Sequence, residues 1–277
     1  MFNSSKLAAG ILPLFIIFLS CTSAYAAPKA NLWPYWQNHD ANSFVVIDHG
    51  RWDAIVKKYV VVNHPSGINR FSYKRVSPED RRLLKDYLQD MQAVRVSSLN
   101  RPEQKAYWIN LYNALTVEVI LAHYPVKSIR DINISPGLFT RGPWDAKLLT
   151  IEGQQISLND IEHRILRPIW RDNRVHYALN CASLGCPNLQ PQAYTSQNME
   201  KLLEEGAREF INHPRGVSFT GNGINVSSIY FWFMENFGGS ETGIIDHLKK
   251  YLSPAGLEKL NHTEKRLRHH YDWKLNE

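Results

Sequence analysis

The segment from Pro102 to His123 constrains the fold more than any other part of the chain. Within it, the sequence QKAYWINLYNALTVEVILAH is apolar around most of the circumference of a helix. A helix of this kind is stable only when other elements cover nearly all of its sides. It is expected to end before Pro125, because a residue that precedes proline is driven out of the helical conformation. The pattern therefore predicts a buried central helix with the remaining elements packed around it.

Local signals predict the elements around this helix. Ser77-Pro78-Glu79-Asp80 is typical of a helix start, with a capping hydroxyl, proline at the first position and acids in the first turn. Ser157 is expected to cap a second helix over 158–167. Further helices are predicted over 197–212 and, two or three in number, between residues 226 and 271. Strands are predicted over 44–47, 69–76 and 175–179, with hairpins over 147–156 (turn at Glu152-Gly153) and 217–226 (turn at Gly221-Asn222-Gly223).

These elements are clustered and do not alternate strictly, which favours an α+β fold. We expect one domain over residues 44–277, with buried helices packed on a small mixed or antiparallel sheet. Residues 27–43 are rich in Pro, Trp and Asn without periodicity and are predicted to be an irregular lead-in.

The N-terminus has the pattern of a secretory signal peptide. A charged start, an apolar stretch and Ala24-Tyr25-Ala26 follow one another, so residues 1–26 are predicted to be removed and the protein to be periplasmic or secreted. A lipid anchor on Cys21 is one alternative, and a hydrophobic helix that stays attached is another. Beyond residue 30 no stretch approaches the roughly 18 uninterrupted apolar residues of a membrane span, so no such span is expected in the mature chain.

Charge and composition limit the classes of binding partner that we expect. The formal charge of the 277-residue chain is +6 and 44% of its residues are hydrophobic, which is ordinary for a globular protein. Such a balance predicts solubility and weak attraction to anionic surfaces. The densest basic run, residues 264–270, is predicted to be a solvated helix face, and no nucleic-acid-binding signature accompanies it. We therefore expect no nucleic-acid partner and no cofactor.

Two cysteines, Cys181 and Cys186, remain once the leader is removed. In an oxidising compartment two thiols five positions apart most often form a disulfide. The turn-forming residues between Asn180 and Pro187 would bring them to the separation of about 5.5 Å that a disulfide needs between Cα atoms. The competing hypothesis is that Cys181 is a nucleophile. Zinc is less favoured and no metal is expected, because there is no second cysteine pair.

His176 lies close to this loop in sequence. If residues 175–179 form a strand, His176 and Cys181 point to opposite faces and lie about 16 Å apart. A catalytic His176–Cys181 pair would then require a sharp turn after Asn180.

Polar residues on the two predicted helices are further candidates. Asn110 and Asn113 lie three apart inside the apolar helix, and a buried amide without partners costs about 1–3 kcal/mol. They are expected either to pin a neighbouring loop or to orient a catalytic group. Glu162 and His163 are adjacent, and they suit proton transfer only if both face a pocket.

Four motifs together resemble one known family. AYWINLYNALT, SLNDIEHRILR, VHYALNCASLGCP and the terminal YDWKLN are similar to the exported bacterial branch of the domain-of-unknown-function family 547. The resemblance runs from about Ser43 to the C-terminus and implies little about activity. A distant relation to papain-like and transglutaminase-like thiol enzymes is a further hypothesis, although the apolar helix carries no Cys. Residues at the characteristic positions of the family are Asn110, Asn113, Glu162, His163, His176, Asn180, Cys181, Cys186 and Pro187.

Two functions remain open. The first is a pocket around His176, Cys181 and Cys186 that binds a small molecule or peptide. The second is an acyl transferase or amide hydrolase with Cys181 as nucleophile. Under the second hypothesis the catalytic candidates are Cys181, His176, Asn110 and Glu162. The expected pocket or orienting residues are Asn113, His163, Asn180 and Ser183.

Overall fold

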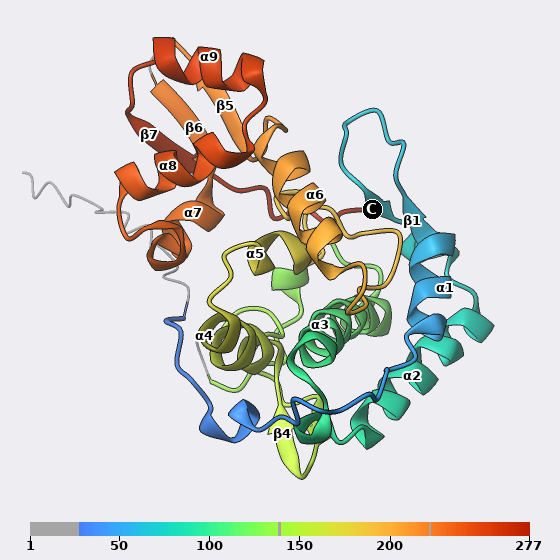
Figure 1. Ribbon diagram of the computed structural model, residues 1–277. Helices are drawn as coiled ribbons and strands as arrows, with labels where there is room; N and C mark the ends of the chain where they lie inside the picture. Colours follow the sequence, from blue (N-terminus) through green and yellow to red (C-terminus); the bar gives the residue numbers. More distant parts are fainter. Residues whose placement is uncertain (1–27, 138–139, 222) are drawn as a thin grey trace, which may run out of the picture.

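The protein is described by a computed structural model, which covers residues 28–137, 140–221 and 223–277. The predicted signal peptide, its cleavage site and Cys21 lie outside these residues. Short sheets and many helices make up the chain, in agreement with the predicted α+β class. Figure 1 shows α3 (Arg101–His123) in the centre of the larger part of the molecule.

The central helix forms as predicted. Asn100 caps it by accepting a hydrogen bond from the Glu103 amide at 3.0 Å, and Pro102 lies in its first turn. Nearly all of its residues are buried, including both asparagines. The helices α1 (Gly50–Tyr59) and α2 (Pro78–Ala93) cover one side of this region, with α2 packed directly on α3.

The other helices are mostly short. Those after α3 are α4 (Arg167–Trp170), α5 (Val175–Ala178), α6 (Met199–Ile211), α7 (Ser228–Trp232), α8 (Glu241–Tyr251) and α9 (Pro254–His262). One π-helix, η5, spans Asp160–Leu166. The 3-10 turns are η1 (Pro34–Gln37), η2 (Tyr73–Arg75), η3 (Val96–Ser98), η4 (Ile129–Asp131) and η6 (Met234–Phe237).

Three small sheets accompany these helices. Two are antiparallel pairs, β1 (Val60–Val61) with β2 (Arg70–Phe71) and β3 (Leu149–Ile151) with β4 (Gln154–Ile156). The third has β6 (Gly223–Ser227) at its centre, antiparallel to β5 (Val217–Thr220) and parallel to β7 (Leu267–His270). Both predicted hairpins are confirmed, and Glu152 and Gly153 have positive φ angles of 47° and 76° at the first turn.

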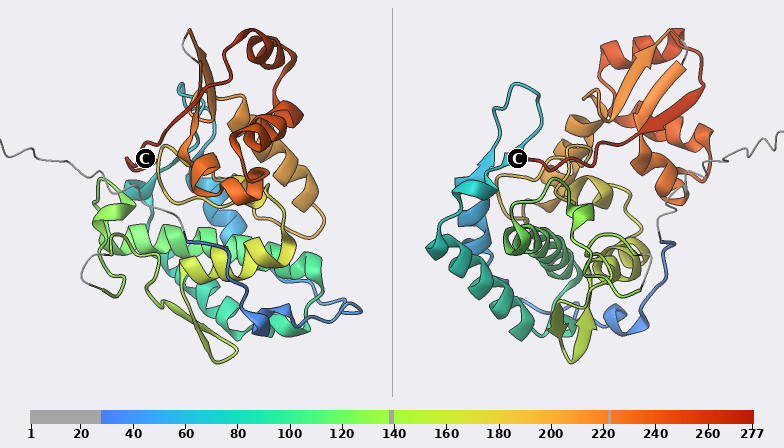
Figure 2. Two further views of the ribbon diagram at one scale, coloured as in Figure 1. Left: turned by 90° about the vertical axis from the view of Figure 1, so that its left-hand side faces the viewer. Right: turned by 180° about the vertical axis from the view of Figure 1, so that it is seen from behind.

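The apolar side chains gather in two clusters. The larger surrounds α3, and the smaller lies between the three-stranded sheet, α6, α7 and α8. Figure 2 shows the sheet, α8 and α9 standing to one side of the larger part, and the segment after β7 returning to it. That return is fixed by main-chain hydrogen bonds, from Leu275 to Lys127 and from Phe71 to Asn276, both 2.8 Å.

Four local predictions are wrong, and three of them concern residues 44–47, 69–76 and 264–270. Residues 44–47 form no strand, and Phe44 is 96% exposed, because no neighbouring chain pairs with this segment. Residues 69–76 contribute only the two residues of β2 before the chain turns into η2. The basic run 264–270 is not a helix face: its second half is β7, an edge strand whose charged side chains remain in solvent, as is usual at sheet edges.

The predicted strand over 175–179 is instead the short helix α5. The Leu179 amide donates to the Val175 carbonyl at 3.2 Å. Val175 and Ala178, three apart, belong to the larger cluster, whereas Tyr177 belongs to the smaller one. The apolar side chains of α5 thus point into two different cores, and their spacing only resembles the alternation of a strand.

Candidate functional site

The helix that begins after Ser157 carries the first part of the site. The Ser157 hydroxyl accepts from the Asp160 amide at 3.2 Å, and the Asp160 carboxylate accepts from the Ser157 amide at 2.8 Å, so the expected cap is present. The helix then widens into η5, in which the Arg167 amide bonds to the Glu162 carbonyl, five residues back. π-Helical turns occur frequently at functional sites.

Side chains from distant parts of the chain enclose a cavity of about 90 Å³ next to this helix. Its floor is polar and its walls are largely aromatic. The lining residues are Pro28, Tyr112, Trp144, Asn159, Glu162, His163, His176, Leu179, Cys181, Cys186, Pro187, Ile229, Trp232, Phe233 and Trp273.

Glu162 is the acidic group at this cavity. Burial raises its pKa from 4.5 to about 7, and the effect exceeds the opposing influence of Arg167 and of the hydrogen bond from Tyr112. The Tyr112 hydroxyl donates to Glu162 Oε2 at 3.3 Å. Near neutral pH this carboxyl is therefore divided between its protonated and ionised forms.

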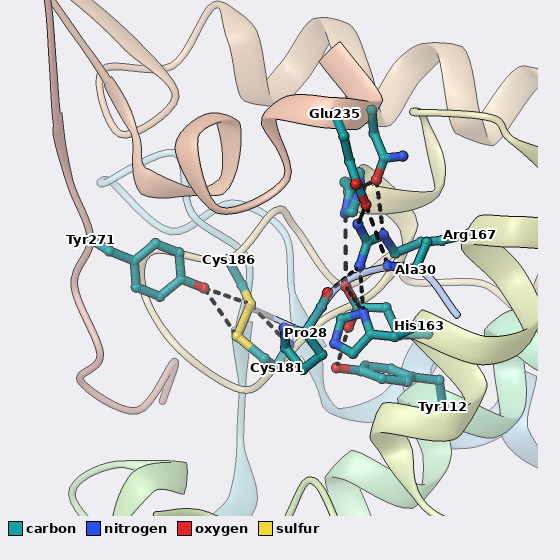
Figure 3. A network of polar contacts seen from close by, with 12 residues as sticks. Pro28, Ala30, Tyr112, His163, Arg167, Cys181, Cys186, Glu235 and Tyr271 are labelled. Carbon is teal, nitrogen blue, oxygen red and sulfur yellow. Dashed lines mark hydrogen bonds and ion pairs between the residues drawn. A yellow bond between two sulfur atoms is a disulfide. The ribbon is translucent and has the colours of Figure 1, made fainter. Parts of the chain in front are cut away.

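Arg167 fixes the orientation of His163 (Figure 3). Its Nη1 lies 2.9 Å from His163 Nδ1 and 2.8 Å from the Pro28 carbonyl, and its Nη2 lies 2.6 Å from a Glu235 oxygen. A guanidinium only donates, so His163 Nδ1 accepts and the hydrogen of the neutral ring is on Nε2. Burial first, and then the charge of Arg167, hold the pKa of His163 well below its usual value.

The orientation and the protonated nitrogen of His176 are likewise fixed by a hydrogen bond, here to Asn236. Asn236 Oδ1 accepts from Arg167 Nε at 2.9 Å, which identifies this atom as the amide oxygen. The same oxygen lies 2.9 Å from His176 Nε2, so Nε2 donates and Nδ1 carries a lone pair. Burial lowers the pKa of His176 to about 3. His176 Nδ1 lies 3.8 Å from Glu162 Oε1, a separation that a small movement would close to a hydrogen bond.

Cys181 and Cys186 are joined by a disulfide, with their Cα atoms 6.2 Å apart. The Tyr271 hydroxyl lies 3.0 Å from Cys181 Sγ and 3.1 Å from Cys186 Sγ, and Figure 3 shows it pointing at both sulfurs. The Ser183 hydroxyl contacts Tyr271 at 3.0 Å. Gly185 lets the chain around Asp272 approach, since a Cβ at residue 185 would lie 2.9 Å from the Asp272 nitrogen. The disulfide thus forms part of the cavity wall and leaves Cys181 without a free thiol.

Asn110 and Asn113 hydrogen-bond to main-chain groups of neighbouring loops and do not line the cavity. Asn110 donates to the Tyr194 carbonyl at 2.7 Å and accepts from the Tyr194 amide at 2.9 Å. Asn113 makes the corresponding pair with the Ala178 carbonyl and the Asn180 amide. The catalytic role considered for Asn110 is therefore not supported by its position, because both ends of its amide are used by a loop.

Asn180 and Ser183 support the cysteine loop from behind. Asn180 Nδ2 donates to the Pro187 carbonyl and its Oδ1 accepts from the Ala182 amide. Neither residue lines the cavity, although each contacts a group that does.

Several residues of the site were not anticipated. Arg167 had a signal in the sequence, since it follows His163 by four positions on one helix. Trp273 had one in the motif YDWKLN, although the motif alone does not place its ring at the cavity. Trp232, which lines the cavity, and Asn236, which bonds to Arg167 and His176, had none, because only the fold brings them to the site.

Over residues 28–137, 140–221 and 223–277, no three His, Cys, Asp or Glu side chains gather as metal ligands would. No described helix is both long and apolar enough to cross a bilayer.

The fold and site define a class: an α+β protein whose aromatic-walled cavity gathers one carboxyl, two imidazoles and a disulfide. Residues 96–211 match the family model described as "Protein of unknown function, DUF547", which confirms the resemblance to this family over those residues. The terminal YDWKLN lies beyond the match, and the exported bacterial branch stays a prediction. The matched residues include α3, the π-helix and both cysteines, while the aromatic walls at 232, 233 and 273 lie beyond them. Neither the curated proteins nor the solved structures contain a match.

Proposed function

We propose that this is an exported protein whose cavity binds a small molecule or a group of a peptide. One observation carries the proposal. An aromatic-walled cavity places at its floor a carboxyl whose pKa burial has raised to about 7, beside two imidazoles that burial keeps uncharged. Shifted groups of this kind gather preferentially at functional sites.

The size of the cavity limits what enters it. At about 90 Å³ it is smaller than the cavity of about 150 Å³ that holds benzene in an engineered protein. A branched alkyl group or a small ring of the ligand would fill it. Glu162 in its protonated form would donate a hydrogen bond to a polar atom attached to this group, and in its ionised form would accept one from it.

The disulfide separates this proposal from a thiol enzyme. An acyl transferase or hydrolase with Cys181 as nucleophile would require the Cys181–Cys186 bond to be reduced first. As the wall of a binding cavity, the disulfide needs no such step.

A cavity-filling substitution tests the proposal. Small amides, carboxylates, amines and alcohols would be screened against the protein by ligand-observed NMR, and the hits measured against Ile229→Trp. Ile229 lines the cavity, so the hits should lose binding in this variant. Ile245→Trp is the matched control, since Ile245 is similarly buried in the same apolar cluster but does not line the cavity.

Two results would refute the cavity as the binding site. One is a set of hits that bind Ile229→Trp as well as they bind the wild type. The other is the absence of any hit for a folded wild-type protein. Export is tested separately: N-terminal sequencing of the secreted or periplasmic protein should find a start at residue 27.

A further inference from the structure

A short N-terminal segment, residues 28–33, lies along the π-helix and is bound mainly through its main chain. The Asn31 amide donates to the His163 carbonyl at 2.9 Å, and the Trp33 amide donates to the Arg164 carbonyl at 3.0 Å. Alternate residues thus supply the hydrogen bonds, which is how an extended peptide binds to the edge of a sheet.

The carbonyls of His163 and Arg164 are open to this segment for a reason visible in the sequence. The amide of residue 168 would be the intrahelical partner of carbonyl 164 in an α-helix and of carbonyl 163 in a π-helix. Residue 168 is proline and has no amide hydrogen. The widened helix and Pro168 together leave acceptors that an adjacent chain can use.

Two charged side chains extend this row of main-chain contacts. Arg167 Nη1 donates to the Pro28 carbonyl at 2.8 Å, and a Glu235 oxygen accepts from the Ala30 amide at 3.4 Å. The Arg167 side chain is only 2% exposed, and three of its other four N–H groups donate to His163, Asn236 and Glu235. Without the Pro28 carbonyl, a buried donor would lose its acceptor, at a cost that another carbonyl could relieve.

The side chains of the segment contribute little to this binding. Residues 28–31 are exposed, and Trp33, partly buried, stacks on the guanidinium of Arg164 at 4.3 Å from the ring centre. Recognition therefore depends mainly on amides and carbonyls that any peptide possesses.

We propose that the carbonyls of His163 and Arg164, with Arg167 and Glu235, form a binding strip for extended peptides, and that residues 28–33 are its intramolecular occupant. The strip adjoins the cavity at Pro28 and His163, and Arg167 lies over the ring of Phe233, but the hydrogen bonds to the segment involve no aromatic side chain of the cavity. The inference therefore goes beyond the proposed function and does not depend on it.

The test opens the strip and offers a peptide in its place. Asn31→Pro removes the amide hydrogen given to His163, and Trp33→Ala removes the stacked ring; both changes are combined in the full-length chain. Lys29→Pro is the matched control, because the Lys29 side chain is exposed and residue 29 lies between the bonded positions. The probe is a fluorescein-labelled, end-capped hexapeptide with the sequence of residues 28–33, measured by fluorescence anisotropy.

The opened variant should bind this probe at least about ten-fold more tightly than the wild type or Lys29→Pro, in which the tethered segment competes at high effective concentration. A hexapeptide N-methylated at its fourth and sixth residues should bind about ten-fold more weakly, because two main-chain hydrogen bonds are lost. An opened variant with an unchanged circular dichroism spectrum that binds no more tightly than the wild type, or binds both peptides equally, would overturn the inference.

A second measurement uses the unaltered protein, in case the opened variant does not fold. Excess unlabelled hexapeptide should accelerate hydrogen exchange at the amides of Asn31 and Trp33, because it displaces the segment. Unchanged exchange rates at these amides would refute the inference. Small-compound binding in the cavity is a separate readout, so either proposal can fail while the other stands.

Discussion

Two of the networks of buried polar side chains among the described residues differ in the kind of group to which they hydrogen-bond. The asparagine network, Asn110, Asn113 and Asn180, bonds chiefly to main-chain amides and carbonyls. The cavity network, Glu162, His163, His176 and Arg167, bonds mostly side chain to side chain, and burial shifts the pKa of every member. Both consist of buried polar groups, most of them on helices, and the sequence alone offers similar arguments for each.

The comparison shows how to separate structural from functional polar residues. A neutral amide has a donor and an acceptor that match one peptide group, so it can hold a loop without burying charge. An acid and two imidazoles hold a loop less well, because burial must first suppress their charge. Titratable side chains whose burial costs free energy, and which lie beside a cavity, are therefore the residues to test for function.

The largest expected effect comes from breaking the asparagine network. Asn113→Leu keeps a similar volume but leaves the Ala178 carbonyl and the Asn180 amide without their partner. Two buried main-chain groups should together cost about 4 kcal/mol of unfolding free energy. Urea denaturation measures the loss. Asn38→Leu, at an exposed asparagine, should change stability by less than about 0.5 kcal/mol. Equal losses in both variants would contradict the structural role.

The next effect comes from the cavity network and depends on pH. The folded protein holds the Glu162 proton up to about pH 7, whereas the unfolded chain releases it near 4.5. Stability from this group is therefore complete below about pH 4.5 and is lost as the pH rises through about 7. The side chain in Glu162→Gln cannot ionise. The unfolding free energy of this variant, relative to that of the wild type, should therefore rise by about 3 kcal/mol between about pH 4 and pH 8.

Glu118→Gln is the matched control for this pH dependence. Burial also raises the pKa of Glu118, on α3, but the charges of Arg81 and Lys85 oppose the shift, and Glu118 lies outside the cavity. Its pH-dependent gain should be smaller. A gain in Glu118→Gln as large as that in Glu162→Gln would remove the distinction between the cavity and the rest of the protein.

The disulfide should contribute less than either network. Closing a loop of a few residues contributes about 2 kcal/mol in the chain-entropy description. The double variant Cys181→Ser/Cys186→Ser should lose about this amount in denaturant, and reductant should destabilise the wild type equally while leaving the variant unchanged. Mass spectrometry of the tryptic peptide 175–201 should find it two hydrogens lighter before reduction. Two free thiols in that peptide would restore Cys181 as a candidate nucleophile.

The smallest expected effect is an absence of change. Burial lowers the pKa of His176 to about 3 and that of His163 well below 6.5, so neither ring should titrate by NMR between about pH 5 and pH 8. The contribution of His176 to stability is present above about pH 6.5 and is lost as the pH falls toward about 3, and that of His163 is lost in the same direction. Both are opposite in sign to that of Glu162. A titration of either ring near neutrality would show that the cavity admits water freely.

Much of the fold follows from local chemistry in the sequence. The caps at Ser77 and Ser157, the apolar helix α3 and the glycine turns of both hairpins have their causes within a few residues, and all were predictable. The pairing of β7 with β6 depends on residues some forty positions apart, and nothing in a basic run reveals it. The apolar side chains of the short helix α5 have the alternation of a strand because they pack into two different cores.

The candidate site was predictable in part for similar reasons. Glu162, His163, His176 and both cysteines could be selected because titratable groups and thiols in apolar surroundings are unusual. Trp232, Phe233 and Asn236 could not, because such residues look like any others of their type until the fold places them, and Trp273 was marked only as part of the motif YDWKLN. The hydrogen bonds of Asn110 and Asn113 to main chain show that both asparagines have a structural role, which the sequence alone could not distinguish from a catalytic one.

The return of residues 271–276 to the larger cluster has a consequence for biogenesis. These residues bring Tyr271 to both sulfurs and pair with main chain near residues 71, 127 and 184. Contacts between residues so far apart in sequence form slowly, because a long loop must close first. A chain emerging from the ribosome therefore has no finished cavity until residues 271–276 have been made and have packed against the larger cluster. The site is completed later than the helices that carry its carboxyl and imidazoles.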